Sequence, residues 1–267
     1  MTWFHNLSSP HLAAVVVAVT LTVSLVGLAV TARRVRATSL HRTLDNGAIS
    51  GLLAALIGIY AIAAGLTAVA VWGNAGDATA RVGREATAIS VLFHDLAGYP
   101  EPQRTEFRNV LIAYTRYIVD QEWPLHERGE APTVLLPSVA AFERALLGFE
   151  PATEGQKIVH AQAIAAYNNL LEARRMRLQA VTDTALPLAL WAVVLLLGVI
   201  AISACFLLRV ESFGMHAAIT VIVAAPIALI LYFIAVTDRP FQGGVNVSAE
   251  PYRDVLAHIM VPETSRN

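Results

Sequence analysis

Four long apolar runs stand out in a chain whose other residues mix apolar and polar positions with helical spacing. The runs cover residues 11–32, 51–72, 186–208 and 214–236, and none contains an acidic residue, a lysine or an arginine. A helix needs about 20 apolar residues to cross the hydrocarbon core of a bilayer. The pattern therefore predicts four transmembrane helices in two pairs, each pair joined by a short loop.

The first run is expected to stay in the membrane as a span. Residues 1–10 hold no lysine or arginine, and the apolar run that follows is long. A secretory signal peptide instead begins with a basic segment and has a shorter apolar core.

Residues 74–185 separate the two pairs of spans and have the pattern of amphipathic helices. Three stripes of residues three or four apart are expected to face a common core. The stripes are Val82, Glu85, Ile89 and Leu92; Leu111, Tyr114, Ile118 and Glu122; and Ile164, Tyr167, Leu171, Arg174, Leu178 and Val181. No proline separates the second span from the first stripe, so that helix is expected to continue beyond the membrane. Pro124 is expected to end the second helix.

These elements predict an all-α integral membrane protein with four transmembrane helices in two pairs and a helical-bundle insertion between spans 2 and 3. We divide the chain into four parts. They are an N-terminal membrane pair (1–73), the insertion (74–185), a C-terminal membrane pair (186–236) and a tail with a short helix (237–267).

Three charged residues fall on the apolar stripes of the insertion: Glu85, Glu122 and Arg174. An unpaired buried charge costs several kcal/mol, so we expect Arg174 to bind Glu85 or Glu122. One interpretation is a structural ion pair that fixes helix register. The other is that the charges line a water-filled path or gate. Arg175 and Arg177 are expected to face solvent or lipid head groups.

Composition narrows the class of function. Only 15% of the residues are charged, against about 25% in soluble domains, which favours a membrane protein. The net charge of −1 gives no reason to expect a nucleic-acid partner. The chain has no HExxH, phosphate-loop or GxSxG motif, so we expect no enzyme, metal or cofactor. Glu122 and His126 are four residues apart, but Pro124 between them argues against a shared metal site.

Arginines beside the spans predict the orientation in the cell membrane. Four of them flank the first short loop and one the second, namely Arg33, Arg34, Arg36, Arg42 and Arg209. Basic residues favour the cytoplasmic side. Both short loops are therefore expected in the cytoplasm, and the insertion and both termini outside it.

The fourth span ends in the sequence "TDRPFQGGVNVSAEPY". Its helix-stop residues are Asp238, Arg239, Pro240, Phe241 and Gly243. Proline prevents the helix from continuing, and glycine allows the chain to turn. An acid is disfavoured at a helix C-terminus, so Asp238 is expected to bind an arginine, either Arg239 or one elsewhere such as Arg177.

Motifs along the chain resemble the bestrophin-like integral membrane family, which is classed as a domain of unknown function. They are Asn46 with Gly51, "IYAIAAGLTAVAVW", "REA", "AYTRYIVDQEWP", "EARRMRL", "LPLALW" and "DRPFQGGVNVSAEPY". The resemblance covers residues 46 to 256, and QEW and DRPFQG are its strongest parts.

The resemblance implies a homo-oligomeric ion channel, a pentamer by likeness to bestrophins, with the lipid bilayer and inorganic ions as partners. A pore would then be lined by second-span residues Ile57, Tyr60, Ala61, Ala64 and Ala68. Small residues there also permit close helix packing. In bestrophins the insertion is cytoplasmic, which conflicts with the charge-based orientation that we keep. The alternative function is a non-conducting membrane sensor or scaffold whose helical bundle is an interaction surface.

Overall fold

The structure is a computed structural model that describes residues 9–36, 45–132, 137–183, 186–242 and 247–260. Arg42 and Gly243, which figured in the sequence interpretation, lie outside these ranges. The described residues fold into helices without strands, as predicted. They form two compact units, one from residues 1–74 and 184–239 and the other from residues 75–183 and 240–267. We call these the membrane unit and the helical unit.

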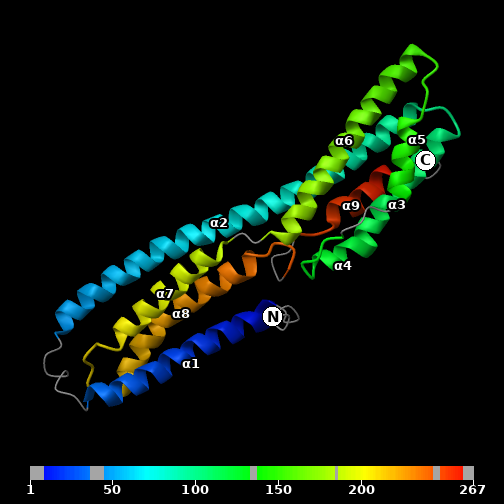
Figure 1. Cartoon of the computed structure of the whole chain (residues 1–267). Coiled ribbons are helices and arrows are strands. Elements are labelled where there is room, and N and C mark those ends of the chain that lie inside the picture. The colour runs from blue at the N-terminus through cyan, green and yellow to red at the C-terminus, as the bar shows by residue number, and fades with distance from the viewer. Residues whose placement is uncertain (1–8, 37–44, 133–136, 184–185, 243–246, 261–267) are drawn as a thin grey trace. The chain divides into compact units, whose positions relative to one another are not determined.

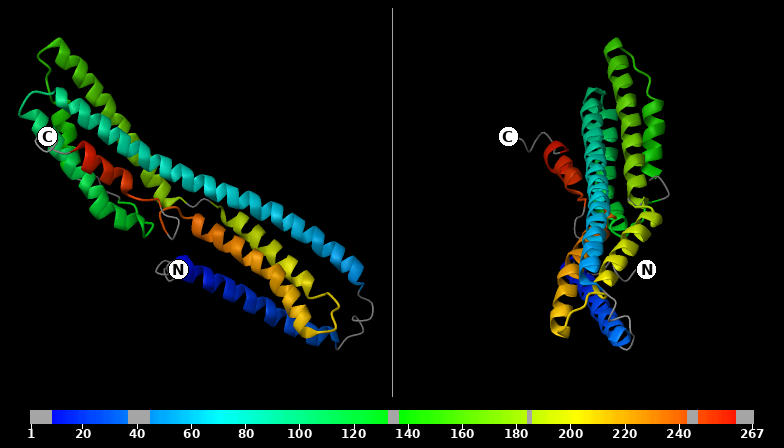
Figure 2. Two further views of the ribbon diagram at one scale, coloured as in Figure 1. Left: turned by 180° about the vertical axis from the view of Figure 1, so that it is seen from behind. Right: turned by 90° about the vertical axis from the view of Figure 1, so that its left-hand side faces the viewer.

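The membrane unit contains α1 (Ser9–Arg36), the first part of α2 (Asn46–Asp95), α7 (Leu188–Cys205) and α8 (Phe213–Thr237). All four helices are long and apolar enough to cross a membrane, which confirms the four predicted spans. Within the unit α8 lies beside both α1 and α7 (Figures 1 and 2).

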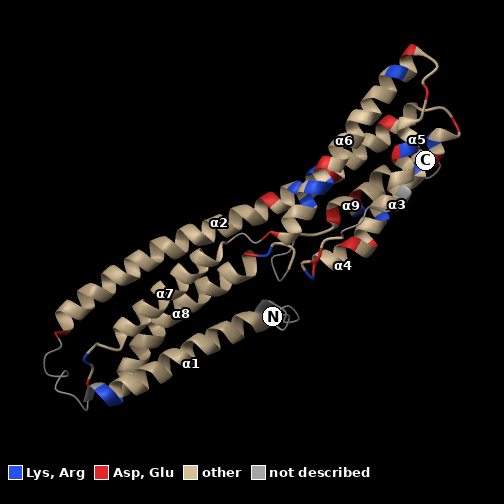
Figure 3. Cartoon of the chain, in the orientation of Figure 1, with Lys and Arg blue, Asp and Glu red and all other residues tan. Residues whose placement is uncertain are grey.

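Large apolar side chains cover the outside of the membrane unit. Val23 is 65% exposed, Ile62 67% and Leu188 85%. Soluble proteins seldom leave so much contiguous apolar surface open to water, whereas lipid-facing helices require it. Charged residues are absent from the apolar stretches of the membrane helices and gather at the end of α1, on the helical unit and in the connecting segments (Figure 3). The exposed apolar surface is therefore what a bilayer would cover.

The inner side of α2 packs against α7 and α8. Tyr60 and Ala64 share a buried cluster with Val194 of α7 and Ile227 of α8. Gly198 makes room for this contact, because a Cβ there would lie 3.3 Å from Ile227 and 3.4 Å from the ring of Tyr60. Close approach of helices through small residues is typical of membrane packing.

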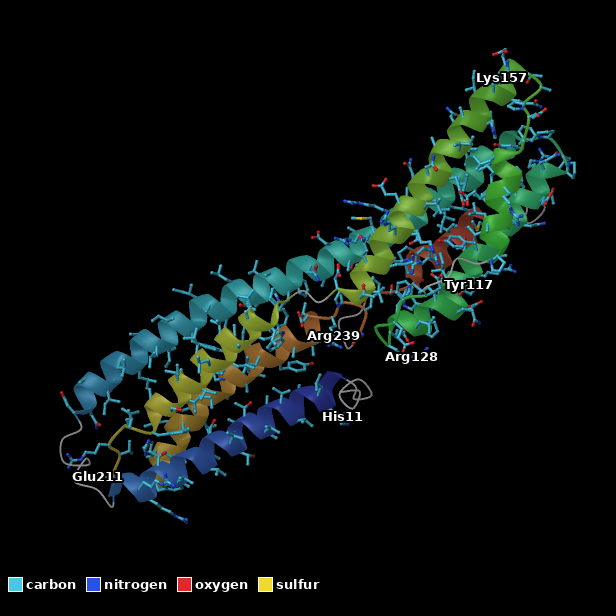
Figure 4. The ribbon with its side chains drawn as sticks, viewed as in Figure 1. His11, Tyr117, Arg128, Lys157, Glu211 and Arg239 are labelled. Carbon is cyan, nitrogen blue, oxygen red and sulfur yellow. The ribbon has the colours of Figure 1, made fainter. Side chains whose placement is uncertain are left out.

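The amide of Asn46 holds the start of α2 to the segment between α7 and α8. Its Nδ2 donates to the carbonyl of Arg209 at 2.8 Å, and its Oδ1 accepts from the N–H of Arg209 at 2.8 Å. Figure 4 marks Glu211 in this segment and Arg239 beyond the opposite end of α8.

The second helix continues without a break for 50 residues, as the absence of proline predicted. Its residues 75–95 belong to the helical unit together with α3 (Gln103–Tyr117), α4 (Trp123–His126), α5 (Pro137–Leu147), α6 (Glu154–Thr182) and α9 (Glu250–Asp254). The tail after residue 240 thus belongs to the same compact unit as the insertion.

The second helix of the insertion does not stop at Pro124, contrary to the prediction. A π-helical turn, Ile118–Glu122, follows α3 directly, and α4 then begins at Trp123 with Pro124 in its first turn. Proline is tolerated there because the first N–H groups of a helix have no partner within the helix. The chain therefore stays helical to His126, which gives that residue a defined position.

Candidate functional site

Two carboxylates and two guanidinium groups are buried together in the helical unit. Glu85 comes from α2, Glu122 from the π-helical turn, and Arg174 and Arg177 from α6. All four are 5% exposed or less. Their formal charges cancel, which is the condition under which charged groups are tolerated in a protein interior. We call these four residues the ion network.

Arg174 forms a two-pronged pair with Glu122. Its NH2 lies 2.6 Å from Oε1 and its NH1 lies 3.0 Å from Oε2. NH1 also donates to the hydroxyl of Tyr114 at 3.2 Å. Glu122 is one of the two partners expected for Arg174. Parallel N–H···O bonds of this kind fix both distance and orientation between side chains.

Arg177 is the centre of the ion network, although the sequence placed it at the surface. It is fully buried, and its Nε lies 2.5 Å from Oε2 of Glu85. Its NH2 donates to Glu85 at 3.2 Å and to Glu122 at 2.8 Å. The buried side of α6 is turned by about one residue from the predicted stripe. It consists of Ala163, Ala166, Tyr167, Leu170, Arg174, Arg177 and Val181.

Two tyrosines complete the partners of Glu85. The hydroxyl of Tyr114 donates to Oε1 at 2.8 Å, and that of Tyr252, from α9, donates to Oε2 at 3.0 Å. Burial and then the charge of Glu85 raise the pKa of both hydroxyls well above its usual value. Both tyrosines therefore keep their protons and act as donors to the carboxylate.

His126 contacts the ion network as a neutral acceptor. Its Nδ1 lies 3.1 Å from the carbonyl oxygen of Glu130, and a carbonyl can only accept, so Nδ1 carries the proton. Its Nε2 then faces NH1 of Arg177 as an acceptor. Burial and then the positive charge of Arg177 lower the pKa of His126 to about 4. This role of His126 was not predicted from the sequence, because Pro124 was expected to end the helix before it.

Glu122 is ionised in the ion network. Burial by itself disfavours the charged form. The hydrogen bonds and charges of Arg174 and Arg177 outweigh that effect, so the pKa of Glu122 lies below its usual value. Burial by itself lowers the pKa of Arg177, but the charge and hydrogen bonds of Glu85 hold that pKa well above its usual value.

Each carboxylate oxygen of the ion network accepts at least one hydrogen bond from an arginine or a tyrosine. A void of about 20 Å³ borders Tyr114 and Arg174. That is room for about one water molecule. These bonds and the small void favour a structural ion pair between helices over a water-filled path. Among the described residues no group of three His, Cys, Asp or Glu side chains is placed to hold a metal ion.

Residues from the two strongest sequence motifs, QEW and DRPFQG, pack against each other beside the ion network. The ring of Phe241 lies 5.9 Å from the rings of Trp123 and His126. Trp123 also meets Tyr252 at 6.0 Å. Next to them Gly129 adopts a φ of 76°, which favours glycine, and a Cβ there would collide with the side chain of Gln242. The tail is therefore held to the turn after α4.

In the membrane unit, Asp238 binds the start of α7. Its carboxylate accepts from the N–H of Leu186 at 2.9 Å and from the indole N–H of Trp191 at 3.2 Å. Arg177, suggested as its partner, binds Glu85 and Glu122 instead. Because α7 and α8 are antiparallel neighbours, the acid at the end of α8 lies at the N-terminus of α7, where negative charge is favourable.

The five residues predicted to line a pore fall on different sides of α2. Tyr60 and Ala64 are buried against α7 and α8, and Ala68 packs against the same cluster. Ile57 and Ala61 are exposed. The buried residues have no surface to offer to a passage outside their own subunit, so a lining role is retained as a proposal only for the exposed ones.

A comparison with protein families matches residues 14–252 to a family described as "Bestrophin-like domain". The match confirms the resemblance found in the sequence and extends it to the first membrane helix. No curated protein and no solved structure matches the chain.

Proposed function

The chain belongs to the bestrophin-like family, and we propose that it is a homo-oligomeric ion channel of the membrane. Four apolar helices with widely exposed outer surfaces support insertion in a bilayer. The observation that carries the proposal is the outer face of α2, on the opposite side of that helix from Tyr60.

This outer face bears glycines seven residues apart, at Gly51, Gly58 and Gly65, with Ile62 and Val69 between and beyond them. At 100° per residue these five side-chain positions lie about 140–200° from Tyr60. A Cβ added at any of the three glycines would meet nothing within 4 Å. Small residues at such intervals let the same helix of another subunit approach closely.

Around a symmetry axis, the outer face of α2 is the surface that would surround a passage. Of the lining first predicted from sequence, Tyr60 and Ala64 point the other way, while the exposed Ile57 and Ala61 lie beside this face and are kept as candidates. The face is apolar through the membrane, and an apolar constriction can gate ion flow by excluding water.

Reconstitution of the whole chain in liposomes tests this proposal. We expect an oligomer and ion flux, both reduced by Gly58→Leu. Ala70→Leu is the matched control, because Ala70 is exposed on α2 but lies away from the glycine face. A confirmed oligomer that gives no ion flux over a range of pH and voltage would contradict the channel proposal.

A non-conducting sensor or scaffold is the second candidate. Intramembrane charge often marks ion pathways, and the four predicted spans contain no acid, lysine or arginine. The closed ion network of the helical unit also fits a rigid interaction module. An oligomer that is silent in the flux assay yet retains a protein partner through the helical unit would favour this candidate.

Orientation is part of the same proposal. The arginines beside the first and second short loops support a cytoplasmic position for both loops and an external position for the helical unit. A topology reporter fused at about residue 130 tests this, since that position lies in the turn after α4. A cytoplasmic signal from the reporter would place the helical unit in the cytoplasm, opposite to the proposed orientation.

A further inference from the structure

A cleft of about 250 Å³ lies between α2 and α6 in the helical unit. Arg81, Arg84 and Ala88 line it from α2, and Asn169, Glu172 and Met176 line it from α6. We call it the arginine cleft. Its volume is slightly below the usual range for drug-sized ligands, which suits a small polar group.

The two arginines of the cleft are three residues apart, so they project from one face of α2. NH1 of Arg81 donates to the carbonyl of Met176 at 3.2 Å, which orients that guanidinium across the cleft. In the part of the chain that the structure describes, neither Arg81 nor Arg84 forms an ion pair with a carboxylate.

This contrasts with the ion network, where Arg174 and Arg177 are fully matched by carboxylates. The cleft holds two guanidinium groups against one carboxylate, that of Glu172. Guanidinium groups present planar pairs of donors that fit the oxygens of an oxyanion. The amide of Asn169 adds a further donor, while Ala88 and Met176 offer an apolar wall.

We propose that the arginine cleft binds a phosphate group between Arg81 and Arg84. The phosphate can belong to a lipid head group or to a small soluble molecule, since the recognition chemistry is the same. The carboxylate of Glu172 repels a bare anion and so lowers its affinity for the cleft. It favours ligands that also carry a hydroxyl or an amine. This assignment does not depend on whether the chain conducts ions.

The first test uses inorganic phosphate and the full chain purified in a maltoside detergent, which contributes no phosphate. Phosphate should raise the thermal unfolding temperature in a saturable way, relative to chloride at equal ionic strength. Arg84→Gln and Arg81→Gln should each weaken binding about tenfold or more, since hydrogen bonds to charged groups are lost. Glu172→Gln should strengthen it.

Arg175→Gln is the matched control, because Arg175 is exposed on α6 and does not line the cleft. The unfolding temperature without phosphate checks that each variant folds. Arg84 is exposed, so its replacement is expected to leave the fold intact.

The second test uses nanodiscs of phosphatidylcholine with and without phosphatidic acid, and native mass spectrometry of retained lipid. Retention of phosphatidic acid that depends on Arg81 and Arg84 would assign the phosphate to a lipid. Arginine-dependent binding of inorganic phosphate alone would assign it to a soluble ligand. If the double variant Arg81→Gln/Arg84→Gln behaves like wild type in both tests, or wild type binds neither probe, the proposal is wrong.

Discussion

The guanidinium of Arg177 and the carboxylate of Glu85 form an ion pair that is completely shielded from solvent, with 2.5 Å between Nε and Oε2. The two residues are 92 positions apart and join α6 to α2. Arg177 also binds Glu122, and Glu85 also accepts from Tyr252. One pair therefore links α2, α6, the π-helical turn and the tail helix α9.

Removing the charge of Arg177 should destabilise the helical unit strongly. Arg177→Gln leaves Glu85 buried without its cation, and breaking a buried pair on one side costs about 3–5 kcal/mol. The unfolding temperature in detergent measures the effect. Arg175→Gln, two residues away on the exposed side of α6, should change stability by no more than about 0.5 kcal/mol. Equal effects of the two variants would contradict the central role of Arg177.

Glu85→Gln distinguishes a fastening from an ion path. The amide keeps the shape of the carboxylate but loses its charge, so we expect lower stability and unchanged ion flux per folded oligomer. Asp120→Asn, an exposed site on the π-helical turn, is the control and should alter neither quantity. Flux that changes while the unfolding temperature stays constant would instead place Glu85 on a conduction path.

Stability should fall as the pH is lowered from about 6.5 toward about 4. The folded protein holds His126 neutral, because burial and Arg177 depress its pKa from 6.5 to about 4. Between these values the unfolded chain binds a proton that the folded chain does not, so acid favours unfolding by an amount of order 3 kcal/mol.

His126→Gln should remove most of this pH dependence from the unfolding temperature, although it also lowers stability at neutral pH. His94→Gln, an exposed site near the end of α2, should leave the slope as in wild type. The hypothesis fails if the slope between pH 6.5 and 4 is the same in His126→Gln and wild type.

Most of the fold could be predicted from the sequence, because spans and amphipathic stripes are local patterns. Glu85 and Glu122 were found because they sit at helical spacing among apolar residues. Arg177 was missed because an error of one residue in the stripe of α6 turned it outward. His126 was missed because Pro124 was taken as a helix end, whereas a π-helical turn places this proline in a first turn.

The partner of Asp238 was beyond sequence reasoning for a different cause. Its charge is unfavourable at the end of its own helix, and only the antiparallel pairing of α7 with α8 supplies the N–H groups of Leu186 and Trp191. The rule about helix ends was sound. The rule could not say which helix start lies beside Asp238, because a single sequence does not encode that neighbour locally.

Asp238→Ala should loosen the α7–α8 pair of the membrane unit. It leaves the buried N–H of Leu186 without its acceptor, which costs about 1–3 kcal/mol. Trp191→Phe removes only the indole bond and should cost less, and Asp238→Asn should be intermediate because it retains one acceptor oxygen. Unfolding temperatures of the three variants in one detergent give the ranking. A Trp191→Phe effect as large as that of Asp238→Ala would indicate that ring packing dominates.

Gly129→Ala should weaken the attachment of the tail to the helical unit. The φ of 76° is strained for alanine, and its Cβ would collide with the side chain of Gln242. We expect a loss of about 1–3 kcal/mol, in line with the cost of an unfavourable backbone conformation. Gly155→Ala is the control, since its Cβ would meet only an ordinary contact 4.0 Å away in the first turn of α6. Gln242→Ala in the Gly129→Ala background should restore part of the loss by removing the collision.

Limited proteolysis of the tail should follow the same order, because a tail released from Trp123 and His126 exposes the chain around Phe241. Unchanged proteolysis in Gly129→Ala would mean that the aromatic contacts of Phe241 hold the tail without help from this turn.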